Sequence, residues 1–71
     1  MVKAFCERLK ELREEKGISQ VELSKQLKYK LSASAIGRWE NGERSPTLES
    51  LIILADFFCV TLDYLAGRQD Y

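Results

Sequence analysis

Helix-capping and helix-stopping residues divide this sequence into five short segments. Ser19, Ser32 and Thr61 can each accept a hydrogen bond from the first turn of a following helix, and Pro46-Thr47 can open another. Gly17, Gly42 and Gly67 stand where a helix would end. Within the segments, apolar residues recur at intervals of three and four, as on one face of an α-helix. The sequence therefore predicts an all-α fold of five helices without strands.

The apolar residues of each segment define the side that we expect to face a common core. Helices are predicted over residues 3–16, 19–28, 32–41, 46–58 and 61–65. The expected inner residues are Phe5, Leu9 and Leu12, then Leu23, Ser24 and Leu27, then Ala35, Ile36 and Trp39, and finally Leu48, Leu51, Ile52, Ala55 and Phe58. Seventy-one residues allow one domain, 1–71, near the lower size limit for a self-sufficient core.

The inventory of reactive side chains excludes several function classes. There are two cysteines, Cys6 and Cys59, and small disulfide-stabilised domains usually have four or more. We expect both thiols to be reduced and buried, with a single disulfide as the alternative. Histidine is absent, which removes the commonest general base and the commonest zinc ligand. No metal, no cofactor and no enzymatic activity is therefore expected.

The charges are distributed unevenly although the net charge is zero. Residues 1–46 hold ten Lys/Arg and seven Asp/Glu, and residues 47–71 hold one and four, so the two parts carry +3 and −3. The first ten residues are too charged for a signal peptide, and the longest apolar run, 51–55, is too short to cross a membrane. We expect a cytoplasmic protein.

The third predicted helix has an unusually small outer face. Opposite its inner residues it carries Ala33, Ser34, Gly37, Arg38 and Asn41, so that its backbone can approach another molecule closely. It follows a second short helix after a brief connection. Two such helices, the second with a small polar outer face, are typical of a helix-turn-helix.

Motifs along the chain strengthen this interpretation. They are Leu9-x-x-Leu12-Arg13, Gly17-Ile18-Ser19-Gln20-x-x-Leu23, Ile36-x-Arg38-Trp39-Glu40-x-Gly42, Ser45-Pro46-x-Leu48-x-x-Leu51 and Leu62-Asp63-x-Leu65. In this order they closely resemble the Cro/repressor-like family of DNA-binding domains, also named after the xenobiotic-response element, over about residues 5–67. The resemblance implies a lambda-repressor-like five-helix bundle from a bacterium or phage. It also implies a sequence-specific transcriptional regulator, expected to be a repressor, that docks its third helix in the major groove of double-stranded DNA.

The resemblance also implies roles for individual residues. The base-reading residues are expected to be Ala33, Ser34, Gly37 and Arg38, and those that bind phosphates Gln20, Lys30, Asn41 and Arg44. Arg38 could bind guanine O6 and N7 together. Arg13 and Glu40 are expected to form an exposed salt bridge between the first and third helices.

Two features depart from the family. The connection 27–32 is two residues longer than usual and lacks glycine, so the third helix could lie at a different distance or angle. Cys59 stands where the family often has glycine, and a left-handed backbone there would cost about 1–2 kcal/mol. The altered connection and the zero net charge leave an alternative open, a protein-interaction module on the same fold, such as an antitoxin or an anti-repressor partner.

The fourth helix is too apolar for a helix with one buried side. Ile53 and Phe57 lie roughly opposite its predicted inner face, and Leu54 extends the same patch. Adjoining apolar surface is typical of an interface, so a homodimer through Ile53, Leu54 and Phe57 is predicted. The alternative is that the C-terminal tail of the same chain covers this patch.

Overall fold

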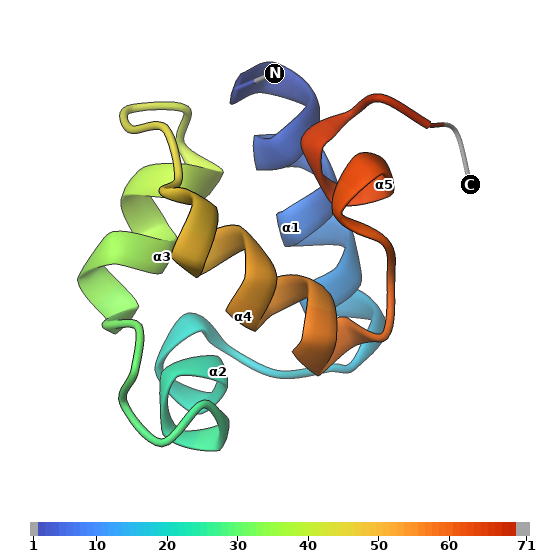
Figure 1. Cartoon of the computed structure of the whole chain (residues 1–71). Helices are drawn as coiled ribbons and strands as arrows, with labels where there is room; N and C mark the ends of the chain where they lie inside the picture. Colours follow the sequence, from blue (N-terminus) through green and yellow to red (C-terminus); the bar gives the residue numbers. More distant parts are fainter. Residues whose placement is uncertain (1, 70–71) are drawn as a thin grey trace.

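The computed structural model describes residues 2–69, which contain five α-helices joined by short connections (Figure 1). They are α1 (Val2–Glu15), α2 (Gln20–Gln26), α3 (Ala33–Glu40), α4 (Leu48–Phe58) and α5 (Leu62–Ala66). No strand occurs within residues 2–69, so the predicted all-α class is confirmed. None of these helices has the length and apolar character needed to span a bilayer.

The helices begin where the capping residues predict. The side-chain oxygens of Ser19, Ser32, Thr47 and Thr61 each accept a hydrogen bond from the backbone N–H three residues later, at 3.0–3.1 Å. Such caps each stabilise a helix by about 1 kcal/mol. Helices as short as α2, α3 and α5 would not be stable in isolation and depend on tertiary packing. The caps determine at which residue each of these helices begins.

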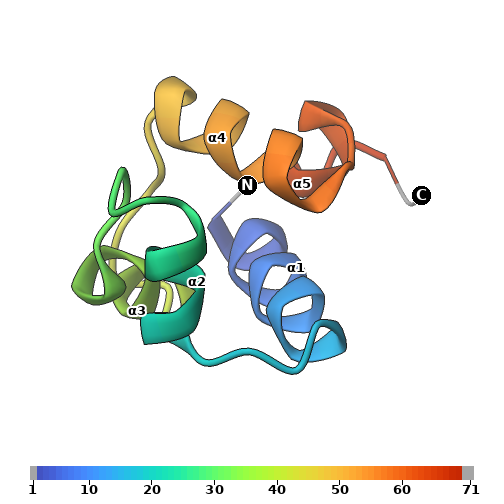
Figure 2. The ribbon, with the colours of Figure 1, turned by 90° about the horizontal axis from the view of Figure 1, so that it is seen from below.

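Every helix contributes to one core. Helix α1 packs against α3 and α5, α2 packs against α3, and α4 packs against α5. Figure 2 shows α2 and α3 together on the left, α1 at the lower right, and α4 and α5 above them. The largest fully buried side chains come from all five helices: Phe5, Leu9, Leu23, Ile36, Leu54 and Leu65. The two helices of the predicted helix-turn-helix are therefore held by the rest of the bundle.

Helix α4 is rotated relative to the prediction. Its buried residues are Ser50, Leu51, Leu54, Ala55 and Phe58. Leu48 is 67% exposed and Ile52 is 42% exposed, so the prediction that they face the core is wrong. The prediction that Leu54 belongs to an outer patch is also wrong, because Leu54 is fully buried. The run 51–54 is apolar at every position, so helical periodicity cannot choose its inner face.

The other two residues of the predicted patch lie at the edge of the core. Ile53 and Phe57 are half-buried and pack against the core cluster. The Phe57 ring meets the Phe58 ring edge to face, with centroids 4.9 Å apart. The Lys16 ammonium lies 5.5 Å from the centroid of the Phe57 ring. The prediction that both side chains face solvent is therefore wrong.

The connection between α2 and α3 turns without glycine. Lys28 and Tyr29 both adopt left-handed backbone conformations, with φ of 56° and 62°, so α2 ends at Gln26 instead of reaching Lys28 as predicted. The backbone N–H of Tyr29 donates to the carbonyl of Ser24 at 2.9 Å, and the Ser24 hydroxyl donates to the carbonyl of Leu31 at 2.8 Å. Ser24, predicted to face inward, thus holds both ends of the turn from within.

The two cysteines have different environments. Both are free, Cys6 is half-buried and its thiol donates to the backbone carbonyl of Glu40. Cys59 is exposed, so the prediction that it is buried is wrong. It is the C-cap residue of α4, in a left-handed conformation with φ 57°, and the following Val60 N–H closes the helix end on Ala55 at 3.0 Å.

Replacing Cys59 with Gly is expected to raise the free energy of unfolding by about 1 kcal/mol, because glycine adopts the left-handed conformation without steric cost. In a domain of this size that corresponds to a melting temperature about 4–8 °C higher, measurable by circular dichroism. Cys59→Ala is the matched control, since it removes the thiol and retains the strained backbone. Equal melting temperatures for the two variants would contradict the explanation.

Candidate functional site

Helix α3 lies at one edge of the molecule (Figure 1). One of its faces is buried in the core and the other is exposed to solvent. Ile36 and Trp39 are buried, as predicted. On the outer face, Ser34 and Arg38 are exposed, while Ala33 and Gly37 are half-buried. The structure thus brings the four predicted base-reading residues together on one surface, with Ser34 and Arg38 the most accessible.

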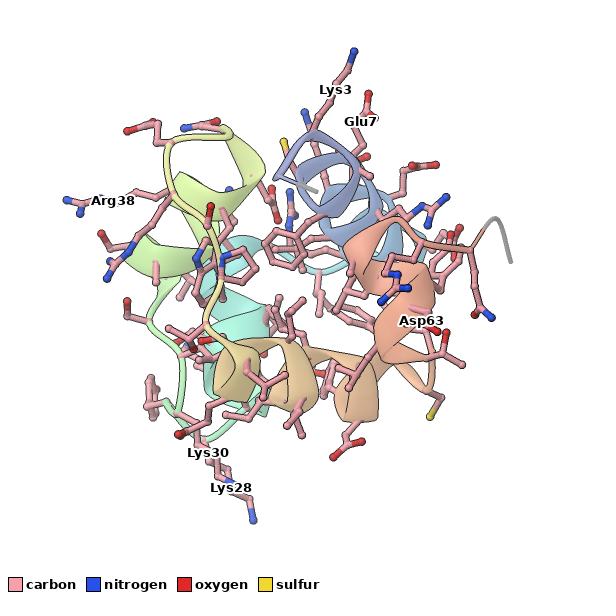
Figure 3. All side chains as sticks on the ribbon, turned by 45° about the horizontal axis from the view of Figure 1, so that its top comes forward. Lys3, Glu7, Lys28, Lys30, Arg38 and Asp63 are labelled. Carbon is pink, nitrogen blue, oxygen red and sulfur yellow. The ribbon has the colours of Figure 1, made fainter. Side chains whose placement is uncertain are left out.

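Arg38 is the long side chain of this surface. It extends from α3 away from the molecule, as Figure 3 shows. Within residues 2–69 it has neither a hydrogen-bond partner nor a counter-ion. A guanidinium presented in this way keeps all its donors for another molecule, and its planar fork matches the paired acceptors of guanine.

Gly37 faces a neighbouring helix of the same chain. A Cβ atom added at this position would lie 3.2 Å from Oε1 of Gln20, the first residue of α2. The missing side chain therefore lets Gln20 lie across α3. The sequence predicts that Gly37 allows close contact with another molecule. In the structure, the missing side chain makes room for Gln20 of the same chain.

A buried ion pair fixes Gln20 and the end of α3. The Arg13 guanidinium donates to both carboxylate oxygens of Glu40, at 2.7 and 2.9 Å, and the Gln20 amide donates to Oε1 of Glu40 at 3.1 Å. The predicted pair is confirmed, but it is not exposed, because the two side chains are 13% and 3% accessible. Arg13 also donates to the Ile18 carbonyl at 2.7 Å, so the network ties α1, α2 and α3 together.

The same pair shifts the titration of Arg13. The hydrogen bond with Glu40 raises the pKa of the Arg13 guanidinium above its ordinary value, and the attraction of the Glu40 charge adds to this, while burial acts in the opposite direction. Arg13 is therefore charged throughout the pH range in which the protein could fold.

Two of the predicted phosphate-binding residues line one hollow of about 370 Å³ beside α3. Lys30 comes from the connection before α3 and Arg44 from the connection after it. The remaining lining residues are Tyr29, Leu31, Ser32, Ala35, Trp39, Ser45, Thr47 and Ser50. None of these lining residues is acidic, so the hollow presents two cations and several hydroxyl groups to an anion.

The other two predicted phosphate-binding residues are engaged elsewhere. Gln20 donates to Glu40, as described above, and the Asn41 amide donates to the Glu43 carboxylate at 3.2 Å. Sequence reasoning missed Ser45 and Thr47 as neighbours of Lys30 and Arg44. Their polar side chains flank Pro46 directly after Arg44, and this position in the sequence could have indicated that they belong to the same site.

Several basic residues near α3 and one acidic residue of α5 lie on different sides of the molecule. Figure 3 shows Arg38, Lys28 and Lys30 extending from α3 and from the connection before it, and Asp63 on α5 at the opposite side. The charges are not fully separated in space, because Asp56 lines a second hollow together with Lys28 and Lys30.

The chain matches the family model described as helix-turn-helix over residues 9–65. It is 41% identical over 66 residues to the HTH-type transcriptional activator BcrR of Enterococcus faecalis, covering 93% of this chain and 31% of that protein. It is 32% identical over 66 residues to the uncharacterized HTH-type transcriptional regulator YobD of Bacillus subtilis, and 36% identical over 63 residues to the HTH-type transcriptional regulator PrpR of Mycobacterium tuberculosis. These matches cover 93% and 89% of this chain, but 57% and 13% of the two relatives. No solved structure matches the chain significantly.

Proposed function

Because the chain belongs to the helix-turn-helix family, we propose that it is a transcriptional regulator that binds specific sequences of double-stranded DNA through α3. The observation that carries the proposal is the outer face of α3. Exposed Ser34 and Arg38 stand there between two connections, which contribute Lys30 and Arg44. Arg38 and Ser34 would read base edges, and the flanking cations would bind phosphates. The proposed setting is the cytoplasm, where a chromosome or phage genome is accessible.

The proposal is tested by selecting bound sequences from a random duplex library and then titrating salt against the selected duplex. We expect enrichment of one short motif and an affinity that falls steeply as salt rises, because each neutralised phosphate releases counterions. Lys30→Ala should reduce the slope of log affinity against log salt by about 0.9. Lys3→Ala is the matched control, because Lys3 is exposed on α1 at a distance from α3 (Figure 3). A protein that enriches no motif and binds without salt dependence would instead support the interaction-module alternative.

The proposed mode of regulation is repression by occupancy. A protein bound at a promoter excludes polymerase and needs no contact beyond those with DNA. The relative from Enterococcus faecalis is named an activator, so the mode has to be measured for this chain. Transcription in vitro from a promoter that contains the selected sequence should fall on addition of the protein, and a rise would assign activation.

We further propose that the regulator binds as a homodimer through the outer face of α4. Leu48 and Ile52 are exposed one helical turn apart, and half-buried Ile53 adjoins them. An exposed apolar pair of this kind is a feature of interfaces. A two-fold dimer could place two copies of α3 in successive major grooves, about 34 Å apart.

Leu48→Glu combined with Ile52→Glu is therefore expected to give a folded monomer with much weaker operator binding. Sedimentation equilibrium measures the oligomeric state, and circular dichroism confirms the fold. Leu62→Glu is the control, because Leu62 is also an exposed apolar residue but lies on α5. A wild-type protein that remains monomeric well above its DNA-binding concentration would contradict the dimer.

A further inference from the structure

Trp39 carries a buried donor that the fold does not use. The side chain is 4% exposed, and its ring meets Phe5 edge to face with centroids 6.1 Å apart. Its indole Nε1 is buried and has no hydrogen-bond acceptor within residues 2–69. Buried polar atoms are paired in the great majority of cases, so an unpaired donor needs an explanation.

The indole belongs to the wall of the basic hollow beside α3. Trp39 lines this hollow together with Lys30 and Arg44, which approach from opposite ends of the helix. The first turn of α4, capped by Thr47, borders the same space, and the N-terminal end of a helix carries partial positive charge. An anion in the hollow would therefore meet two cations, a helix end and one neutral donor.

We propose that this hollow seats one phosphate of the DNA backbone and that the Trp39 indole N–H donates to it. The inference rests on the proposed function and deepens it by assigning a backbone contact to a residue that otherwise belongs to the core. Because Nε1 is covered in the unbound structure, the contact requires a rearrangement of the side chains that surround the indole. The indole then fixes the position of the phosphate, while the two cations supply the attraction.

Trp39→Phe tests the contact, because it removes the N–H and keeps an aromatic ring in the core. The variant is expected to bind the selected duplex and a random duplex about 10- to 100-fold more weakly, the range for a hydrogen bond to a charged group. Its salt slope should equal that of the wild type, since a neutral donor releases no counterion. Arg44→Ala should lower the salt slope by about 0.9. The difference between the two salt slopes distinguishes the contribution of the indole to DNA binding from that of the cations.

Phe5→Leu controls for packing around the ring. It alters the neighbour of Trp39 in the core and leaves the indole N–H in place, so we expect lower stability with nearly wild-type affinity of the folded protein. Circular dichroism at the binding temperature verifies that each variant is folded. If Phe5→Leu weakened DNA binding as much as Trp39→Phe, the effect would come from packing and the proposal would be overturned.

Nuclear magnetic resonance gives a second measurement, because Trp39 is the single tryptophan and yields one indole N–H signal. That signal should move downfield on addition of duplex DNA, and inorganic phosphate at the same ionic strength shows whether a free anion suffices. A signal that DNA leaves in place, or a Trp39→Phe variant that binds like the wild type, would overturn the indole contact alone. A wild type that binds no duplex at all would overturn the proposed function as well.

Discussion

Replacing Arg13 with Met is expected to lower the free energy of unfolding by about 3–5 kcal/mol, because it leaves the buried Glu40 carboxylate without its cation. A domain of this length has a total stability of about 4–11 kcal/mol, so the variant would be close to unfolding at room temperature. Urea denaturation followed by circular dichroism would measure the loss. The expected result follows from the depth of the pair, since exposed ion pairs contribute only about 0–1 kcal/mol.

A second substitution separates the ion pair from the space that it fills. Arg13→Met combined with Glu40→Leu replaces both charges with apolar side chains of similar size, and we expect most of the lost stability to return. If the double variant were as unstable as Arg13→Met, unpaired charge would not be the cause of the loss.

Arg38→Ala is expected to relax the preference at one base pair of each half-site by about 1–3 kcal/mol, or roughly 5- to 150-fold. The reason is that the guanidinium is the long, unpaired donor of the outer face of α3. Binding to a duplex with that base pair changed should fall much less, so the ratio of the two affinities is the measurement. Stability should change little, since Arg38 is exposed.

Arg68→Ala is the matched control for Arg38→Ala. It removes the same charge from another exposed position, in the acidic C-terminal third, and should leave base preference intact. Equal preferences for the wild type and Arg38→Ala would show that the recognition surface has been assigned to the wrong residues.

The parts of the fold that depend on local chemistry could be predicted from the sequence. Ser19, Ser32 and Thr61 each start a helix because a short polar side chain satisfies a backbone N–H of the first turn, an interaction within four residues. The inner face of α3 was predictable for a similar reason. Ile36 and Trp39 are its only large apolar residues, so periodicity leaves one solution.

The inner face of α4 could not be predicted in this way. Leu51, Ile52, Ile53 and Leu54 are all apolar, so several rotations of the helix bury a comparable surface. The choice is made by shape, through contacts with distant helices, and Leu54 rather than Ile52 fits the core. The predicted dimer surface of Ile53, Leu54 and Phe57 depends on this rotation. The surface proposed from the structure therefore consists of Leu48 and Ile52, with Ile53 beside them.

The turn before α3 could not be predicted from the sequence either. Propensity disfavours left-handed lysine and tyrosine, so Lys28 and Tyr29 gave no local signal for that conformation. The turn is instead held by Ser24, through its backbone carbonyl and its hydroxyl. The hollow of the candidate site could not be predicted for the same reason. Lys30 and Arg44 are fourteen positions apart in the sequence, and only the fold places them around one hollow.

The contact between Gly37 and Gln20 has a consequence for how such a regulator could evolve. Ser34 and Arg38 face solvent, so mutations there can change the preferred operator while the bundle stays intact. A side chain at Gly37 would press on Gln20 and, through Glu40, on the network that joins three helices. Divergence of this protein toward new target sites should therefore proceed more readily through positions 34 and 38 than through position 37.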